Sequence, residues 1–300
     1  MRTDVTALAA EHGIALDESS IRFSEAGLDY RVAFATATDG VEWVLRMPRR
    51  PDVSAKIPAE AAILELVRTQ LAVAVPDWRV HDAELIAYPL LPGSPGLTVS
   101  DAGEPEWHFD RDSLDYSRSL GRLIAGLHAV TVPATTDSTD ADVPVETPDD
   151  VRSGWRSALE RVSEAFTVAP ALTAAWQAWL DDDGLWPDRT VFTHGELYPA
   201  HLLLEGDEIR SVLDWTTAKV SDPAIDFMYH FVLSSPEAFA AALEAYEQSG
   251  GSVPPRIEER CTALYAIGPL NYALFALQSG DPEHAAVAQA QLDPEAQLDP

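Results

Sequence analysis

The stretch between Val191 and Phe227 constrains the fold more than any other part of this 300-residue chain. It contains three short apolar runs, at 191–193, 202–204 and 209–213, and each run leads into polar side chains. Gly206-Asp207 separates the last two runs and predicts a tight turn between paired strands. We therefore expect four polar side chains to converge at one end of a small β-structure: His194, Glu196, His201 and Asp214.

Asp214 and His201 are side chains that could bind a divalent cation, and that cation would in turn bind the phosphates of a nucleotide. A carboxylate at the end of a strand can hold Mg²⁺, which prefers oxygen ligands and bridges nucleotide phosphates. A neutral imidazole also ligates Mg²⁺, although it is a weaker partner for a hard cation than an oxygen atom. Two alternatives stay open: Asp214 is an ordinary turn residue, or His201 is a partly buried histidine with a structural role.

The Val191–Phe227 stretch, with Asp214-Trp215 and the spacing Asp222-Pro-x-x-Asp226, resembles the catalytic and metal-binding loops of the aminoglycoside-phosphotransferase-like kinases. Four other segments narrow the resemblance to the macrolide 2′-phosphotransferases, and they occur in the same order along the chain: 27–31, 43–50, 75–80 and 273–277. The resemblance covers all but the last few residues. It implies a bilobal protein-kinase-like α+β fold, with a small antiparallel-sheet N-terminal lobe and a larger, mainly helical C-terminal lobe.

The same resemblance implies an activity. Macrolide 2′-phosphotransferases use GTP and Mg²⁺ to phosphorylate the 2′-hydroxyl of the amino sugar of a macrolide, which inactivates the antibiotic. The habit of the family, and no residue of this chain, favours GTP over ATP. Kinases that act on aminoglycosides, homoserine or choline are the rival interpretation, because they share Asp214 and Asp226 but not the N-terminal segments.

Glu196 is the one departure from the family pattern, which has Asp at this position. The resemblance makes it the base that accepts the proton of the acceptor hydroxyl and orients that hydroxyl. The extra methylene shifts the carboxylate by about 1–1.5 Å, and a misplacement of about 1 Å can cost on the order of a hundredfold in rate. Three outcomes are open: the backbone compensates and activity is full, activity is reduced, or the protein is a weakly catalytic binder of macrolide and nucleotide. We favour retained activity, because Asp and Glu differ in reach and not in chemistry.

Arg46 is the predicted phosphate-binding cation, since it ends the third predicted strand, where protein kinases carry a lysine. A guanidinium can fork across phosphate oxygens, and Glu60 on the following helix is its natural partner. The alternative is a surface arginine within the basic stretch Arg46–Arg50. Lys56 is a second candidate phosphate contact. Gly27 lies in a loop that the resemblance places over the nucleotide, with an ordinary turn as the alternative.

Other residues are expected to frame these groups. The backbone from Tyr88 to Leu91 is predicted to pair with the edge of a purine. By resemblance, His194 braces the catalytic loop and Asp226 hydrogen-bonds to the backbone of that loop. Asp222 has the same supporting role, or it caps the helix that begins near Pro223.

The acceptor site is the part that the sequence constrains least. Six aromatic residues lie near the motif or on predicted C-terminal helices, and most aromatic residues at helical spacing belong to a core. We select four of them, beside Glu196, as substrate-binding residues: Tyr198, Phe231, Tyr272 and Phe275. Acidic side chains nearby would suit the dimethylammonium group of a macrolide amino sugar.

The hydrophobic pattern predicts the order of the elements. A helix begins at Thr3 or Asp4, and a second helix covers 59–71. Five antiparallel strands are predicted at 20–25, 30–37, 41–47, 77–81 and 84–88. Proline and glycine then predict a hinge at 89–93, between a nucleotide-binding lobe (1–88) and a catalytic and acceptor-binding lobe (94–300). The second lobe should contain a solvated loop at 131–150, a frayed C-terminal tail, and helices at 111–129, 149–166, 170–181, 223–233, 236–249 and 255–279.

Composition excludes several other classes of protein. A net charge of −29 argues against nucleic acid or an anionic membrane as a partner, and no feature implies a protein partner. The single cysteine, Cys261, fits a reducing compartment, and no apolar run reaches the length of a membrane span, so we expect a cytoplasmic protein. His194-Gly195-Glu196 matches the His-x-Glu of zinc deaminases, but the Pro-Cys-x-x-Cys partner of that chemistry is absent from the sequence.

Overall fold

The N-terminal strands form one antiparallel sheet in the order β1-β2-β3-β5-β4. The computed structural model describes residues 2–25, 29–100, 102–133 and 143–293. The strands of the sheet span Arg22–Ser24 (β1), Tyr30–Thr36 (β2), Glu42–Pro48 (β3), Val80–His81 (β4) and Ile86–Pro89 (β5). The predicted five-stranded antiparallel lobe is therefore confirmed.

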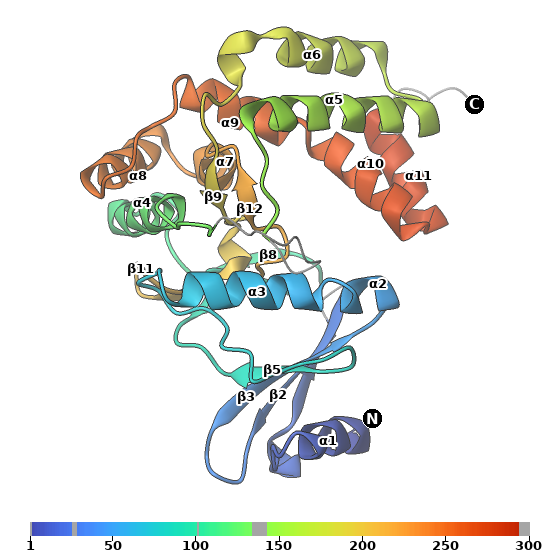
Figure 1. Cartoon of the computed structure of the whole chain (residues 1–300), viewed down its shortest axis with the longest axis vertical. Coiled ribbons are helices and arrows are strands. Elements are labelled where there is room, and N and C mark those ends of the chain that lie inside the picture. The colour runs from blue at the N-terminus through green and yellow to red at the C-terminus, as the bar shows by residue number, and fades with distance from the viewer. Residues whose placement is uncertain (1, 26–28, 101, 134–142, 294–300) are drawn as a thin grey trace.

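The two faces of this sheet have different partners. Side chains alternate between the faces of a strand, so Ala33 and Ala35 of β2 share one face with Leu45 of β3, and helix α1 (Arg2–Glu11) packs on that face. Val32 and Phe34 point the other way, toward the C-terminal lobe. Figure 1 shows α1 on the outer side of the sheet, away from the second lobe.

Helix α3 (Ile57–Arg68) joins the two lobes, and a short helix α2 (Pro51–Ser54), which was not predicted, precedes it. Ile63, Leu64 and Val67 of α3 lie in the same buried cluster as residues of the C-terminal lobe. The chain after α3 then pairs with that lobe, since Ala74 N–H donates to the Arg210 carbonyl (2.8 Å) and the Ala74 carbonyl accepts from Val212 N–H (3.0 Å). Although α3 belongs to the first lobe in sequence, it is fixed to the second (Figure 1).

The connection between the lobes is anchored at its far end. The hydroxyl of Ser211, which is fully buried, donates to the Pro92 carbonyl at 2.7 Å. Gly93 has a φ of +95°, and a Cβ there would lie 2.9 Å from the carbonyl carbon of Leu203, so this position requires glycine. Strand β6 (Ser94–Pro95) then pairs with β10 of the second lobe, so the predicted hinge passes directly into paired backbone.

The C-terminal lobe is mainly helical, with small sheets that carry the loops of interest. Strands β9 (Val191–Thr193) and β12 (Lys219–Ser221) pair with each other, and β10 (Leu202–Glu205) and β11 (Glu208–Val212) form the predicted hairpin around Gly206. A further hairpin joins β7 (Leu97–Val99) and β8 (Pro105–Trp107). The helices are α4 (Leu114–His128), α5 (Pro148–Ala165), α6 (Pro170–Asp181), α7 (Ile225–Leu233), α8 (Pro236–Gln248), α9 (Ile257–Ala266), α10 (Gly268–Ser279) and α11 (Pro282–Leu292).

One prediction about the C-terminal helices was wrong. The single helix expected at 255–279 is broken into α9 and α10 at Ile267-Gly268, because Pro269 lacks the N–H that would continue the first helix. Helix α11, which was not predicted, ends at Leu292, whose side chain is fully buried. The fraying expected of the tail falls mainly on residues 294–300, which lie outside the described residues. Among the described residues, the chain forms no helix long and apolar enough to cross a bilayer.

The close packing of α4 on α8 gives a test of the fold. A Cβ at Gly121 of α4 would overlap the Ala242 carbonyl oxygen and lie 3.0 Å from the Ala245 Cβ, so Gly121→Ala should destabilise the protein by about 1–3 kcal/mol. Gly126, on the same helix, meets only the Leu71 Cδ2 at 3.7 Å. Gly126→Ala should therefore be neutral, or stabilising by up to about 1 kcal/mol through helix propensity. Urea-unfolding midpoints of both variants check this; a loss of similar size in both would contradict it.

Candidate active site

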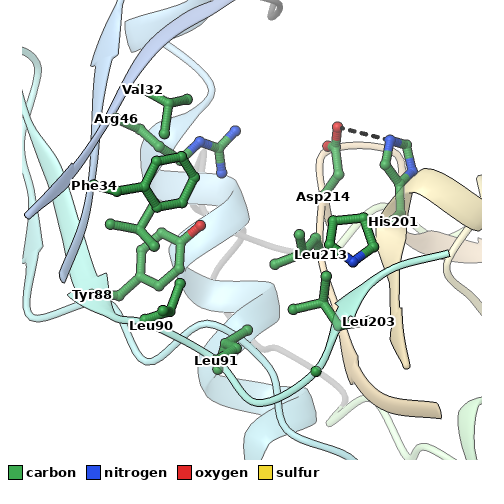
Figure 2. Close-up of a pocket in the computed structure, with 13 residues that line it drawn as sticks. Val32, Phe34, Arg46, Tyr88, Leu90, Leu91, His201, Leu203, Leu213 and Asp214 are labelled. Carbon is green, nitrogen blue, oxygen red and sulfur yellow. Dashed lines mark ion pairs between the residues drawn. The ribbon is translucent and has the colours of Figure 1, made fainter. Parts of the chain in front are cut away.

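A cleft of about 320 Å³ lies between the two lobes (Figure 2). Its walls are apolar: β2, β3 and β5 supply Val32, Phe34, Val44 and Tyr88 from one side, and Leu203 and Leu213 face them from the other. Leu90 and Leu91 line it where the chain crosses between lobes. Charged groups line the cleft at its other end, with Arg46 on one side and Asp214 and His201 on the other. An apolar cleft with charged side chains at one end suits a nucleotide, because the base can occupy the apolar part and the phosphates can contact the charged groups.

Arg46 extends from β3 into this cleft and is held on two sides. Its Nη1 lies 3.6 Å from the Glu60 Oε1, and its guanidinium lies 4.0 Å from the centre of the Tyr30 ring. Burial raises the pKa of Glu60 to about 7, and the positive charge of Arg46 acts in the opposite direction. The structure therefore brings the predicted pair together. Lys56 is exposed at the start of α3 and is not among the residues that line the cleft, and Gly27 lies outside the described residues.

Asp214 and His201 face each other across the charged end of the cleft, with 3.7 Å between the Asp214 Oδ2 and the His201 Nε2. The other ring nitrogen of His201, Nδ1, lies 3.1 Å from the Glu196 carbonyl, which can only accept, so Nδ1 donates to that carbonyl and Nε2 is the nitrogen left to face Asp214 or to bind a cation. Burial would raise the pKa of Asp214, but His201, the Thr216 hydroxyl and Arg46 outweigh it and hold that pKa below its ordinary value.

Two acceptor atoms that face each other in this way fit a shared cation. No group of three or more His, Cys, Asp or Glu side chains with metal-site geometry occurs in the described part of the chain. Mg²⁺ commonly takes one or two protein ligands and completes its shell with phosphates and water. The pair Asp214 and His201 is compatible with that arrangement, and the metal would neutralise phosphate charge when bound.

The loop between β9 and the 3-10 turn Pro199–His201 presents Glu196 beside this pair. Gly195 has a φ of +86°, and a Cβ there would lie 2.7 Å from the Thr217 carbonyl oxygen, so the loop needs glycine before the carboxylate. Burial raises the pKa of Glu196, His201 lowers it, and the negative charge of Asp214 raises it further. The Glu196 carboxylate is thus close enough to His201 and Asp214 to interact with the charges of both.

His194 and Asp226 hold the backbone of this loop. The Asp226 Oδ2 and Oδ1 accept from the N–H groups of His194 (3.1 Å) and Gly195 (2.9 Å). The His194 ring is fully buried, and its Nε2 donates to the Leu213 carbonyl at 2.9 Å while its Nδ1 accepts from Glu196 N–H at 3.2 Å. Burial lowers the pKa of His194, in keeping with a neutral ring that both donates and accepts. These bonds fix the loop to the residue before Asp214.

Asp222 makes the capping contact that was one of its two expected roles, and it has a second partner that was not expected. Its Oδ1 accepts from Ala224 N–H at 2.8 Å, so it caps the turn before α7, and it also forms an ion pair with Arg260 of α9. Arg260 is 2% exposed. No motif or spacing in the sequence marks this residue, since an arginine on a helix is normally at the surface. The pair ties α9 to the turn that precedes α7.

The aromatic residues selected for the acceptor site are not gathered in one place. Tyr198 lies in the catalytic loop, with its ring 5.0 Å from that of Tyr229 on α7. Phe231 packs on Phe239 of α8, also at 5.0 Å, as part of the core. Tyr272 and Phe275 both contact His284 of α11, through a 2.8 Å hydrogen bond and a ring contact respectively.

The other two of the six aromatic residues, Tyr229 and Tyr265, lie near Tyr198, and Tyr229 also interacts with the charge of Glu196. Burial raises the pKa of Tyr229 to about 12, and the charges of Glu196, Tyr198 and Tyr265 add to the effect. Tyr265 is 56% exposed on α9, which packs against α7. Helical periodicity could not select these two residues from the six, because it does not predict which helix faces the catalytic loop.

A model of the phosphotransferase enzyme family matches residues 20–264, which is most of the chain. This chain belongs to the phosphotransferase enzyme family. It is 50% identical to the macrolide 2′-phosphotransferase MphH of Brachybacterium faecium, with 97% of each chain covered and a TM-score of 0.91. A second solved structure, macrolide 2′-phosphotransferase type I, is 41% identical over 97% of this chain and 96% of that one, with a TM-score of 0.88. The predicted kinase-like fold and the resemblance are both confirmed.

Another relative, the uncharacterized protein YcbJ of Bacillus subtilis (strain 168), is 35% identical over 95% of this chain and 94% of its own length. The aminoglycoside 2′-phosphotransferase-IIIa, solved as a GDP complex, has a TM-score of 0.73 at 18% identity and shares the fold. The family model matches the chain from just before β1 to a point within α9, so the matched region includes parts of both lobes.

The contrast between Arg46 and Lys56 gives a test of the phosphate contact in this phosphotransferase. Arg46→Ala should cost about 2–4 kcal/mol of transition-state stabilisation, as the loss of other electrostatic clamps does, because it removes the cation that lines the cleft. Lys56→Ala removes an equal charge from the exposed start of α3 and should leave the kinetics with the nucleotide nearly unchanged. Steady-state kcat/KM for the nucleotide measures both variants; the reverse order would assign the phosphates to Lys56.

Proposed function

We propose that this phosphotransferase uses GTP and Mg²⁺ to phosphorylate the 2′-hydroxyl of the amino sugar of a macrolide, and so inactivates the antibiotic. The observation that carries the proposal is the joint placement of Arg46, Asp214 and His201 around one cleft, with Glu196 close enough to His201 and Asp214 to interact with their charges, in a chain 50% identical to MphH over 97% of its length. The cation and the metal pair provide what phosphoryl transfer needs, which is charge neutralisation and positioning.

Each group has a defined role in this proposal. The apolar slot between Phe34, Tyr88 and Leu203 takes the base, and Arg46 contacts the phosphates, with Glu60 holding its guanidinium. Asp214 and His201 hold Mg²⁺, which supplies positive charge to the phosphates when it is bound. Residues 1–88 form the nucleotide-binding lobe and 89–93 the hinge. Residues 94–300 form the catalytic and acceptor-binding lobe, which also contributes Leu203, His201 and Asp214 to the nucleotide cleft. A chain with one buried cysteine suits the cytoplasm, where GTP and Mg²⁺ are present.

Glu196 is the base in this proposal. Its backbone is fixed on both sides, because its N–H donates to His194 and its carbonyl accepts from Tyr198 N–H at 2.7 Å and from His201. Only the side-chain torsions of Glu196 are left to place the carboxylate. The raised pKa brings this carboxylate closer to the value at which a base accepts a proton near neutral pH, although the transition state needs mainly orientation of the hydroxyl.

The acceptor is proposed to lie against Tyr198 and Tyr229, beside Glu196. Tyrosine rings provide an apolar surface for a sugar ring and favour a cationic ammonium group on their faces. The net charge of −29 of the chain also favours binding of a cationic acceptor. An aminoglycoside, homoserine or choline would also carry a cationic amine, so these remain the alternative acceptors.

A transfer assay with a panel of acceptors separates these possibilities. GTP and ATP are each combined with macrolides, aminoglycosides, homoserine and choline, and the product is identified by mass and by the position of the phosphate. The proposal expects a macrolide 2′-phosphate formed faster with GTP than with ATP. Phosphorylation of one of the other acceptors alone would replace the proposed substrate, and nucleotide-independent macrolide binding without transfer would favour the binder.

Substitutions of Glu196 test its role. Glu196→Gln keeps the size but removes the charge that accepts the proton, so kcat should fall on the order of a hundredfold or more while macrolide affinity changes little. Glu196→Asp restores the residue type of the family, and a large gain would mean that the natural glutamate reaches the hydroxyl imperfectly. Turnover and macrolide binding of the three proteins are compared; equal turnover in all three would remove Glu196 from the reaction.

A further inference from the structure

The backbone around Asp214 is fixed from both sides. Before it, Leu213 N–H donates to the His201 carbonyl at 2.8 Å, and the Leu213 carbonyl accepts from the buried His194 ring. After it, the fully buried Trp215 donates from its indole nitrogen to the Val212 carbonyl at 3.1 Å. The direction in which Asp214 leaves the main chain is therefore set by its neighbours.

Asp214 has an unusual backbone conformation at this point. Its φ is +61°, in the left-handed region, where residues other than glycine are uncommon and Asp and Asn are enriched. Such a conformation persists only when the surrounding structure determines it, and it is frequent at functional sites. It directs the carboxylate into the cleft, where the terminal torsion of an Asp side chain is intrinsically broad.

The Thr216 hydroxyl removes that remaining freedom. Its Oγ1 donates to the Asp214 Oδ1 at 2.7 Å, the length of a strong hydrogen bond to a charged acceptor. The other carboxylate oxygen, Oδ2, is the one that faces the His201 Nε2. The hydroxyl thus occupies one oxygen and orients the other toward the imidazole.

We propose that Thr216 is a positioning residue that orients the Asp214 carboxylate so that Oδ2, together with the His201 Nε2, receives the divalent cation. The inference rests on the proposed metal site and not on the identity of the acceptor. Without the hydroxyl, the carboxylate rotates among orientations of which only some present an oxygen to the cation. The metal then binds less tightly, and so does the nucleoside diphosphate that binds together with the metal.

Thr217 offers a matched control in the same turn. It is exposed like Thr216, and its Oγ1 makes a hydrogen bond of similar length, 2.9 Å, but to the His194 carbonyl of the catalytic loop. Thr217→Val therefore deletes an equivalent hydroxyl that does not touch the metal-binding carboxylate. It is expected to change turnover, through the catalytic loop, without changing metal binding.

The test measures how strongly Mg²⁺ and nucleotide favour each other's binding. The Kd for GDP, with ADP in parallel, is measured by calorimetry with Mg²⁺ and with EDTA, and the ratio of the two Kd values reports the linkage between the ligands. Thr216→Val should reduce this ratio about tenfold, the typical loss for a hydrogen bond to a charged group. Thr216→Ser should restore it, Thr217→Val should leave it at the wild-type value, and Asp214→Ala should bring it close to one.

Several results would overturn the inference. These are an unchanged ratio in Thr216→Val, an equal loss in Thr217→Val, a serine variant that behaves like valine, or a wild-type protein in which Mg²⁺ does not affect nucleotide binding. Thr216→Ala repeats the deletion without a branched side chain, so a steric effect of valine is separated from loss of the hydroxyl. Because the assay contains no acceptor, failure of the macrolide proposal would leave its outcome untouched.

Discussion

The packing of α3 against the C-terminal lobe is the interaction on which the rest of the site depends. Ile63, Leu64 and Val67 of this helix lie in the large core, and Glu60, which is buried one turn earlier on the same face, pairs with Arg46. The backbone pairing of Ala74 with β11 continues the attachment. A buried apolar side chain contributes about 1.5–3 kcal/mol, so these three stabilise the placement of the helix. Arg46, the proposed phosphate-binding cation, is therefore held in a defined position relative to Asp214 and His201, the proposed metal ligands.

A second set of interactions fixes the loops on the opposite wall. Asp226 and His194 are buried, and neither has a role in our proposal that requires contact with substrate. Their hydrogen bonds connect the catalytic loop to Leu213 and so to Asp214. Thr217 connects the turn after Asp214 back to His194, while Thr216 bonds to Asp214 within that turn. Phosphoryl transfer requires reacting groups that are held in position to within about half an ångström. Buried hydrogen bonds to a charged carboxylate are strong and directional, so they can hold the loop backbone with that precision.

Glu196 stands where the family resemblance predicts an aspartate, and the structure shows how the longer side chain is attached. The three hydrogen bonds of its backbone hold the main chain in place, so the additional methylene must be accommodated by the side chain alone. A longer, more flexible arm gains reach and loses some of its fixed orientation. The neighbouring imidazole of His201 and the ring of Tyr198 are the groups in a position to restrict it.

The sequence by itself determined the five antiparallel strands, the hairpin at Gly206, most helices, and the convergence of His201 and Asp214. These follow from side-chain periodicity, from turn residues and from motif spacing, all of which act over short distances along the chain, whereas Arg46 was selected by its resemblance to the phosphate-binding position of kinases. Only the tertiary structure decided the break between α9 and α10, the docking of α11, the pairing of Asp222 with buried Arg260, and the approach of Tyr229 to Glu196. Each of these depends on which helices pack together, and a helix with several apolar faces does not specify its partner until the whole core is assembled.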